Sequence, residues 1–303
     1  MSLPYHEGEL TVQARVNAFD QAVMSAGAIR PYLTVPMARF LTTQPWIVLG
    51  ASDPVGRVWA SLLNGPPGFV AAVDESTVRI EASPAAGDPL HEVARLPTGQ
   101  LAGLLAIDLA RRLRVRINGV LRREPPALVL SVEQAYPNCM KYIQRRELLA
   151  CDEQPAGPVV VGNADRLSAE QAALVHAADT AFIATLNEDH GADVSHRGGR
   201  PGFMTCFPGG KTIRIPDYPG NGMFNTLGNL HLDTRAGLTI PDFTTGGQLQ
   251  LTGHAAADDT TPTGRTLHLT VDRVVHTHKV LPFQFGPVAY SPFLPAETDT
   301  PTG

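Results

Sequence analysis

An internal repeat is the feature that most constrains what this chain can fold into. Blocks of sequence recur at an offset of 134 residues, and one further pair, STVRI (76–80) with KTIRI (211–215), recurs at 135. A repeat of this length exceeds a solenoid unit, so it predicts two copies of one domain. The blocks at 134 are GPPGFV (65–70) with GRPGFM (199–204), AGLLAIDL (102–109) with AGLTIPDF (236–243), and RVRING (114–119) with QLQLTG (248–253).

Each copy has the pattern of a small β-barrel preceded by a short helix. Residues 36–44 and 168–178 are helical in pattern, and the second segment carries Ser168 and Gln171 at capping-box spacing. The runs that follow alternate between polar and apolar residues, as in the segment 248–251, and Gly/Pro/Asp turns separate them. Because closure removes exposed strand edges, we expect a mainly β fold with flanking helices (α+β), built as two tandem barrels.

The expected organisation has five parts. The Pro- and Gly-containing stretch CDEQPAGP separates the two copies, and the C-terminal residues are rich in Pro and Thr, with little to bury. The parts are an N-terminal helical segment (1–29), a first barrel (30–150), a linker (151–164), a second barrel (165–294) and a disordered tail (295–303).

The composition favours a globular protein whose partners are small molecules. The 303 residues are 43% hydrophobic, and the formal net charge of −5 gives no electrostatic reason to bind nucleic acid or an anionic membrane. Cys139, Cys151 and Cys206 form no C-x-x-C pair, and no segment is apolar over the roughly 18 residues that a membrane span needs. We therefore expect a cytoplasmic protein with neither a nucleic-acid nor a membrane partner.

The two copies differ in polarity where they align, and the second copy is the polar one. Ser61 aligns with Ser195, whereas Leu62, Leu63 and Pro66 align with His196, Arg197 and Arg200. The stretch 215–237 also carries asparagines at 221, 225 and 229, spaced as on one helical face, which its counterpart lacks. A helix that starts near residue 222 would present free N–H groups to an anion, and a phosphate is the usual occupant.

The second copy resembles the pyridoxamine phosphate oxidase-like family of FMN-binding split barrels, and the whole chain is similar to its tandem, flavin-nucleotide-binding members. The resemblance covers about 75 residues and is carried by four stretches. These are DVSHRGGRPGF (193–203), IPDYPGNGMFNTLGNL (215–230), DTRAGL (233–238) and LQLTGHA (249–255). It implies two tandem split β-barrels of the FMN-binding type, with the cofactor between them.

The resemblance also implies a set of FMN-binding residues. In the second barrel they are Ser195, His196, Arg197, Pro216, Asp217, Asn225, Thr226 and, opposite the flavin ring, Gln248, with Arg200 and Asn221 as further candidates. The first barrel would complete the pocket with Tyr136, Asn138 and Lys141. Family members often have Arg-Lys where this chain has Asn225 and Thr226, so Arg197, helped by Arg200 or His196, would carry more of the phosphate charge.

The function implied is that of an FMN-dependent oxidoreductase acting on a small molecule, with NAD(P)H or oxygen as redox partner. His196 is the candidate acid or base. The family's architecture also allows a homodimer. Two alternatives remain open: a flavin-binding or sensing module without turnover, and a split barrel that uses a deazaflavin or a haem, for which His196, His276 and His278 are conceivable axial ligands.

Two further patterns are interpreted as structural. The basic run at 111–123 alternates with apolar residues, which is typical of one solvated strand face. His276 and His278 alternate on a strand without a third ligand at suitable spacing, so no metal site is predicted.

Overall fold

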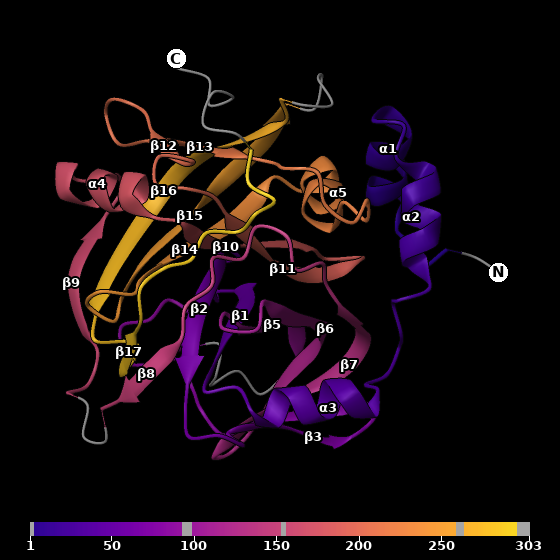
Figure 1. The fold of residues 1–303 in the computed structure, drawn as a ribbon, viewed down its shortest axis with the longest axis horizontal. Coiled ribbons are helices and arrows are strands. Elements are labelled where there is room, and N and C mark those ends of the chain that lie inside the picture. Colours follow the sequence, from indigo (N-terminus) through magenta and orange to yellow (C-terminus); the bar gives the residue numbers. More distant parts are fainter. Residues whose placement is uncertain (1–2, 93–98, 153–155, 259–263, 296–303) are drawn as a thin grey trace.

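The fold is mainly β, with two large antiparallel sheets and five helices among the described residues (Figure 1). The computed structural model describes residues 3–92, 99–152, 156–258 and 264–295. Within these ranges, no helix has both the length and the apolar character needed to cross a membrane.

The first sheet has seven strands in the order β2-β1-β5-β6-β7-β4-β3. Its apolar residues, among them Ile47, Leu104 and Ile117, are buried inside the first barrel with Met37 and Leu41 of helix α3 (Val35–Thr42). The strands are β1 (Trp46–Ser52), β2 (Val58–Asn64), β3 (Val70–Asp74), β4 (Thr77–Ile80), β5 (Gln100–Asp108), β6 (Leu113–Glu124) and β7 (Ala127–Pro137).

The second sheet repeats this path as β11-β10-β14-β15-β16-β13-β12, and β9 is added beside β16. Helix α4 (Ala169–Ala177) takes the place of α3, with the predicted capping box between Ser168 and Gln171. The strands are β9 (Val159–Ala164), β10 (Thr180–Asn187), β11 (Gly191–Gly198), β12 (Thr205–Cys206), β13 (Thr212–Pro216), β14 (Arg235–Asp242), β15 (Gly247–Asp258) and β16 (Thr266–His278).

A bulge at equivalent positions supports the duplication in detail. The register between β6 and β7 shifts at Gly119, and that between β15 and β16 shifts at Gly253, 134 residues later. An ideal Cβ at either glycine would lie 1.9 Å from a carbonyl oxygen, that of Ser131 or of Thr270. Only glycine therefore fits at either bulge.

The two barrels pack against each other through β1, β2 and β5 on one side and β10, β11 and β14 on the other. A third buried cluster, which includes Trp46, Val58, Phe182 and Val194, fills this interface. The backbones approach closely, because a Cβ at Gly50 would lie 2.4 Å from the Val194 side chain. The interface fixes the position of β6 relative to β11, on which the site described below depends.

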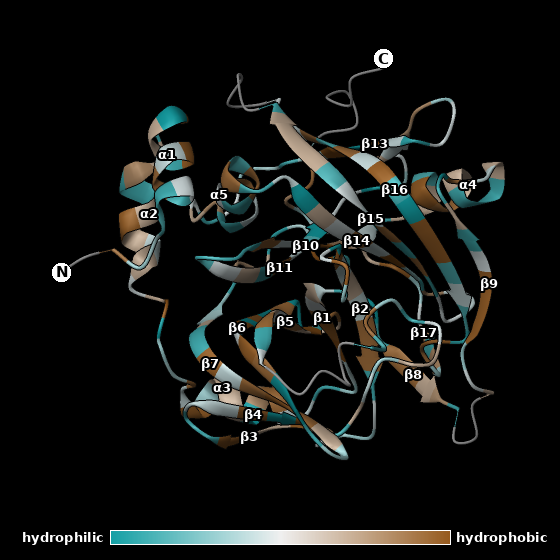
Figure 2. Ribbon diagram, turned by 180° about the vertical axis from the view of Figure 1, so that it is seen from behind, coloured by the Kyte–Doolittle hydropathy of each residue, from teal (hydrophilic) through white to brown (hydrophobic). Residues whose placement is uncertain are grey.

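The N-terminal helices α1 (Glu7–Arg15) and α2 (Phe19–Ala26) lie outside the repeat and pack beside α5 (Asn225–Leu232) (Figure 1, Figure 2). A Cβ at Gly8 would lie 2.3 Å from the carbonyl oxygen of Gly228, so the α1 and α5 backbones are in direct contact. Gln13 donates to the carbonyl of Met223 at 3.1 Å. These contacts hold the helical pair over one end of the second barrel.

The segment predicted as a linker is in part a strand. Residues 159–164 form β9, which extends the second sheet, and β8 (Leu148–Cys151) pairs with β17 (Phe283–Phe285) to form a separate ribbon. The Val159–Val161 run has the β-branched composition of a strand, which the interpretation based on Pro and Gly overlooked. The predicted disordered tail, apart from residue 295, lies outside the described residues.

Candidate functional site

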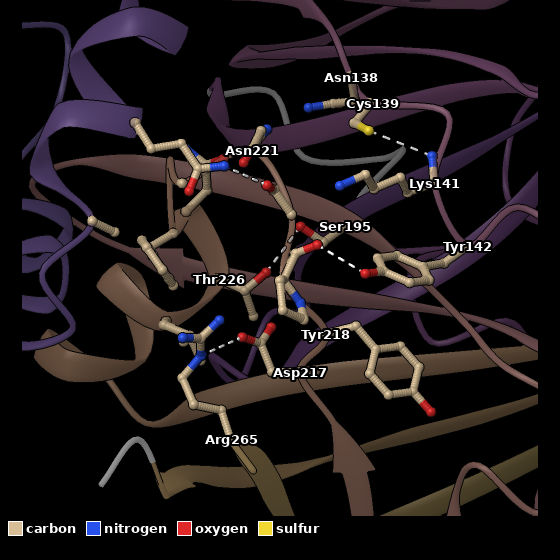
Figure 3. A pocket seen from close by; sticks show the side chains of 18 of the residues that line it. Asn138, Cys139, Lys141, Tyr142, Ser195, Asp217, Tyr218, Asn221, Thr226 and Arg265 are labelled. Atoms are coloured by element: carbon tan, nitrogen blue, oxygen red, sulfur yellow. Dashed lines mark hydrogen bonds and ion pairs between the residues drawn. The ribbon is translucent and has the colours of Figure 1, made fainter. Parts of the chain in front are cut away.

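A cavity of about 500 Å³ lies between the two barrels and is bordered by α2 (Figure 3). The first barrel contributes β6 and the segment 138–142, and the second contributes β11, the loop 216–222 and the start of α5. The volume falls in the range of small-molecule and cofactor sites.

Most of the residues predicted from the sequence line this cavity. They are Asn138, Lys141, Ser195, His196, Arg197, Pro216, Asp217, Asn221, Asn225 and Thr226. Arg200, Tyr136 and Gln248 are not among its lining residues. The cavity therefore brings together side chains that are up to 88 positions apart in sequence, from Asn138 to Thr226.

One part of the wall is a closed network of hydrogen bonds centred on Arg116, from β6. Its guanidinium forms an ion pair with Asp193 at 2.8 Å and donates to the Ser195 hydroxyl at 2.8 Å and to Asn225 Oδ1 at 2.7 Å. The Ser195 hydroxyl also accepts from Thr226 at 2.9 Å and donates to Asp193 at 3.0 Å. Because these polar groups satisfy one another, they shape the wall rather than wait for a ligand.

A second part of the wall carries cations without counter-charges. The guanidinium of Arg114 has no hydrogen-bond or ion-pair partner in the part of the chain that the structure describes, and its Nε is buried. Arg197 reaches Asp217 at 3.4 Å, but Arg265 shares that carboxylate at 2.9 Å. The Nε of Arg197 and both ring nitrogens of His196 also lack partners among the described residues.

The pKa values of these groups reflect this excess of positive charge. Burial, followed by the neighbouring guanidiniums of Arg116 and Arg197, lowers the pKa of Arg114 to about 9. Burial is also the main cause that lowers the pKa of Arg197, and it lowers that of His196 well below its usual value. His196 is therefore a neutral imidazole at physiological pH, and an anion in the cavity would relieve the repulsion around it.

Helix α5 adds backbone donors to the same wall. It begins at Asn225, not near residue 222 as the asparagine spacing predicted, because Phe224 takes a left-handed conformation (φ 61°) at the N-cap. No side chain caps this end, and the first residues of the helix line the cavity. Unpaired N–H groups at a helix start favour an anion.

Two of the predicted site residues lie behind or beside the cavity. Tyr136 is fully buried, and its hydroxyl accepts from Arg116 at 3.1 Å, so it supports that guanidinium from behind. The guanidinium of Arg200 stacks over the ring of Tyr290 at 4.8 Å. Neither side chain reaches the cavity wall.

Gln248 lies at a different place, which the repeat explains. It is buried between β15 and β2, where Gln248 Nε2 donates to Asp88 at 3.2 Å and Gln248 Oε1 accepts from the Leu62 backbone at 3.2 Å. Gln250 donates to Asp88 and to Ser61 there. The offset of 134 converts Ser195 into Ser61 and Arg116 into Gln250, so this is the equivalent of the cavity, made by the opposite pair of barrel walls.

The equivalent site is closed by its own carboxylate. Asp88, in the loop that corresponds to 217–226, is buried and accepts hydrogen bonds from Ser61, Gln248 and Gln250 and from the Leu90 backbone at 2.8 Å. Burial raises its pKa. Neutral glutamines thus stand where the cavity has Arg114 and Arg116, and the two barrels enclose one polar cavity at this pair of sites.

The basic run 111–123 is not one solvated face. Arg114 and Arg116 point into the cavity while Arg122 and Arg123 are exposed, because β6 crosses from the barrel interface to the surface. The alternation alone could not separate the two faces, but the 134-residue offset places 114 and 116 opposite the glutamines at 248 and 250. Other lining residues that the sequence interpretation missed are Cys139, Tyr142, Tyr218, Phe224 and Arg265, and Asn17, Asp20 and Gln21 near α2.

The histidines proposed as haem ligands are not gathered at one place. His276 borders a separate cavity of about 130 Å³ with Asp179 and Phe243, and its ring contacts that of His278 at 4.9 Å. His196 lies at the main cavity with its ring against Phe182. Within residues 3–92, 99–152, 156–258 and 264–295, no group of three His, Cys, Asp or Glu side chains could hold a metal ion.

Known proteins resemble this chain in structure alone. No protein-family model and no curated protein matches the sequence. HupZ from Group A Streptococcus is 12% identical over 36% of this chain and 91% of its own, with a TM-score of 0.29. A putative pyridoxamine 5'-phosphate oxidase from Lactobacillus delbrueckii is 16% identical over 38% and 97%, with a TM-score of 0.30. A Clostridium acetobutylicum protein related to general stress protein 26 is 13% identical over 39% and 89%, with a TM-score of 0.27.

Proposed function

We propose that this chain binds FMN in the cavity between its barrels and acts as a flavin-dependent oxidoreductase on a small molecule. The observation that carries the proposal is the set of buried cationic groups without counter-charges. In a chain of net charge −5, five cationic side chains line the cavity against the carboxylates of Asp20 and Asp217. Such an arrangement is unfavourable unless an anion binds there.

The donors fit a phosphate dianion. Arg114 and Arg197 can form charge-assisted hydrogen bonds, the neutral imidazole of His196 can donate one N–H, and the uncapped start of α5 adds backbone N–H groups. The cavity is larger than a phosphate needs, and its volume leaves room for a ribityl chain and a planar ring. These features, with the sequence resemblance to FMN-binding split barrels, favour FMN over an isolated anion.

When bound, FMN supplies the redox chemistry by accepting and returning a hydride or electrons. The residues of this chain bind, orient and exclude water. The Arg116 network holds the strand and helix walls at a fixed distance, and α2 covers one side. His196 is too strongly held in its neutral form to act as a general acid, so we assign it a binding role instead of the catalytic one expected from the sequence.

The test is to identify what the purified protein carries and whether it turns over. The protein is denatured, and the released small molecule is identified by mass and absorbance. The intact protein, loaded with FMN where loading is partial, is then mixed with NADH or NADPH without oxygen, and the flavin absorbance is followed.

The proposal predicts released FMN and a flavin band that bleaches with at least one reduced nicotinamide and returns with air. Bound FMN that neither nicotinamide reduces would instead support a flavin-binding module without turnover. A haem or deazaflavin spectrum, or no affinity for FMN, would overturn the proposal.

A further inference from the structure

The cavity has a second cationic position, set apart from the buried cluster. Lys141, in the segment that follows β7, lines the cavity and directs its ammonium group toward it (Figure 3). The charges that lower the pKa of Arg114 and His196 are neighbouring guanidiniums, and Lys141 is not among them. The cavity wall therefore has an inner cationic end at Arg114 and Arg197 and a separate one at Lys141.

The ammonium of Lys141 is not neutralised. Across the described ranges, no carboxylate lies within 4 Å of its Nζ, and its recorded contact is with the face of the Phe293 ring, at 5.7 Å from the ring centroid. A half-buried ammonium beside an aromatic ring retains its charge and can accept a single negative group at low desolvation cost. Nearby, the buried Oδ1 of Asn138 also lacks a partner among the described residues.

An aromatic wall stands next to this lysine. The rings of Tyr142 and Tyr218 come from different barrels, and their centroids are 5.1 Å apart with an interplanar angle of 40°. The hydroxyl of Tyr142 donates to the carbonyl of Pro219 at 2.9 Å, which ties the two barrels together across the cavity. Both rings line the cavity, so a flat ligand would meet an aromatic surface there.

The position of Tyr142 is held against its backbone preference. Its φ is 65°, in the left-handed region that costs a residue other than glycine about 1 kcal/mol. Gln144 Nε2 donates to the Tyr142 carbonyl at 3.0 Å, and Gly198 leaves the space that this carbonyl needs. Strain of this kind persists where surrounding contacts fix it, and here it orients the tyrosine ring at the cavity.

We propose that the Lys141–Tyr142–Tyr218 end of the cavity is the substrate subsite and that it takes a planar aromatic ring bearing a single carboxylate. The inference rests on the proposed function, because it assigns the inner cationic end to the FMN phosphate and leaves this end for the substrate. A lone ammonium matches one negative charge, whereas the inner cluster matches a dianion. The tyrosine pair selects a flat ring.

The experiment titrates benzoate and benzamide, which share a ring and differ in charge, into the FMN-loaded protein. Isothermal titration calorimetry gives the affinities, and the flavin absorbance reports whether the probe lies beside the ring. The same titration on the protein without FMN separates the two proposals, because a lysine-dependent preference for benzoate does not require that flavin binds. Lys141→Met and Lys141→Arg are compared with the unaltered chain.

We expect benzoate to bind at least about tenfold more tightly than benzamide, since one charge-assisted contact is worth about 1.5–3 kcal/mol. Lys141→Met should remove this preference while leaving benzamide binding as it was, and Lys141→Arg should restore it. Equal affinity for the two probes, a preference that survives in Lys141→Met, or no binding of either probe would overturn the inference.

Discussion

Replacing Arg114 by glutamine should weaken FMN binding without weakening the fold. The repeat supplies this substitution, because Gln248 stands at the equivalent position in the closed site. The variant loses one charge-assisted contact to the phosphate, worth about 1.5–3 kcal/mol, so the Kd for FMN should rise about 10- to 150-fold.

The same change should leave the protein without FMN as stable as before, or more stable. The fall in the pKa of Arg114 to about 9 corresponds to at most about 5 kcal/mol of unfavourable environment for the charged form. Arg114 is half-buried, so solvent screening and lost packing reduce the gain, and we expect about 0–2 kcal/mol.

The assay pairs FMN titration by flavin fluorescence with urea unfolding of the protein freed of FMN. Arg123→Gln serves as the matched control, because Arg123 lies on the same strand but is exposed, and it should change neither quantity. An Arg114→Gln protein that unfolds more easily by over about 1 kcal/mol and keeps its FMN affinity would refute the reasoning, since Arg114 would then be a structural residue.

Three further predictions concern the groups around the cavity. Burial raises the pKa of Glu9, which accepts from Asn225, to about 7, so its contribution to stability is full below about pH 4.5 and is lost as the pH rises through 7. Glu9→Gln should therefore raise the free energy of unfolding near pH 8 by at most about 3 kcal/mol relative to the unaltered chain, with no gain near pH 4, as measured by denaturant unfolding. Asp88→Ala leaves buried donors without an acceptor and should cost about 1–3 kcal/mol for each unpaired group by the same measurement, whereas an unchanged stability would contradict the closed-site description. Gly198→Ala would place a Cβ 2.1 Å from the Tyr142 carbonyl and should cost about 1–3 kcal/mol, whereas Gly27→Ala, which has open space, should cost nothing measurable in the same thermal melts.

The duplicated architecture could be predicted from the sequence because its signals are local and repeated. Matching blocks at one offset predicted two domains, and the alternation at Leu249 and Leu251 predicted strands that the structure contains. The capping box at Ser168 marked the start of α4 correctly. β9 was missed because its run of valines follows a Pro- and Gly-rich stretch and is recognisable as a strand only when paired with β16.

The site was harder to predict because its walls cross between the copies. The polar contrast in His196 and Arg197 identified the correct barrel, but the strand that faces it is β6 of the other barrel, which brings Arg114 and Arg116. Assigning Gln248 to the same barrel as Arg197 therefore placed it in the closed equivalent site. The contribution of α2 has no counterpart in the repeat, so no internal comparison could have revealed it.

The central claim is that the buried cations of the cavity hold a phosphate, and the most direct measurement compares FMN with riboflavin, which has the same ring and chain without the phosphate. Both are titrated into the protein freed of cofactor, with flavin fluorescence as the readout. Two charge-assisted contacts from Arg114 and Arg197 predict that riboflavin binds at least about 100-fold more weakly than FMN. Equal affinities for the two flavins would contradict the claim.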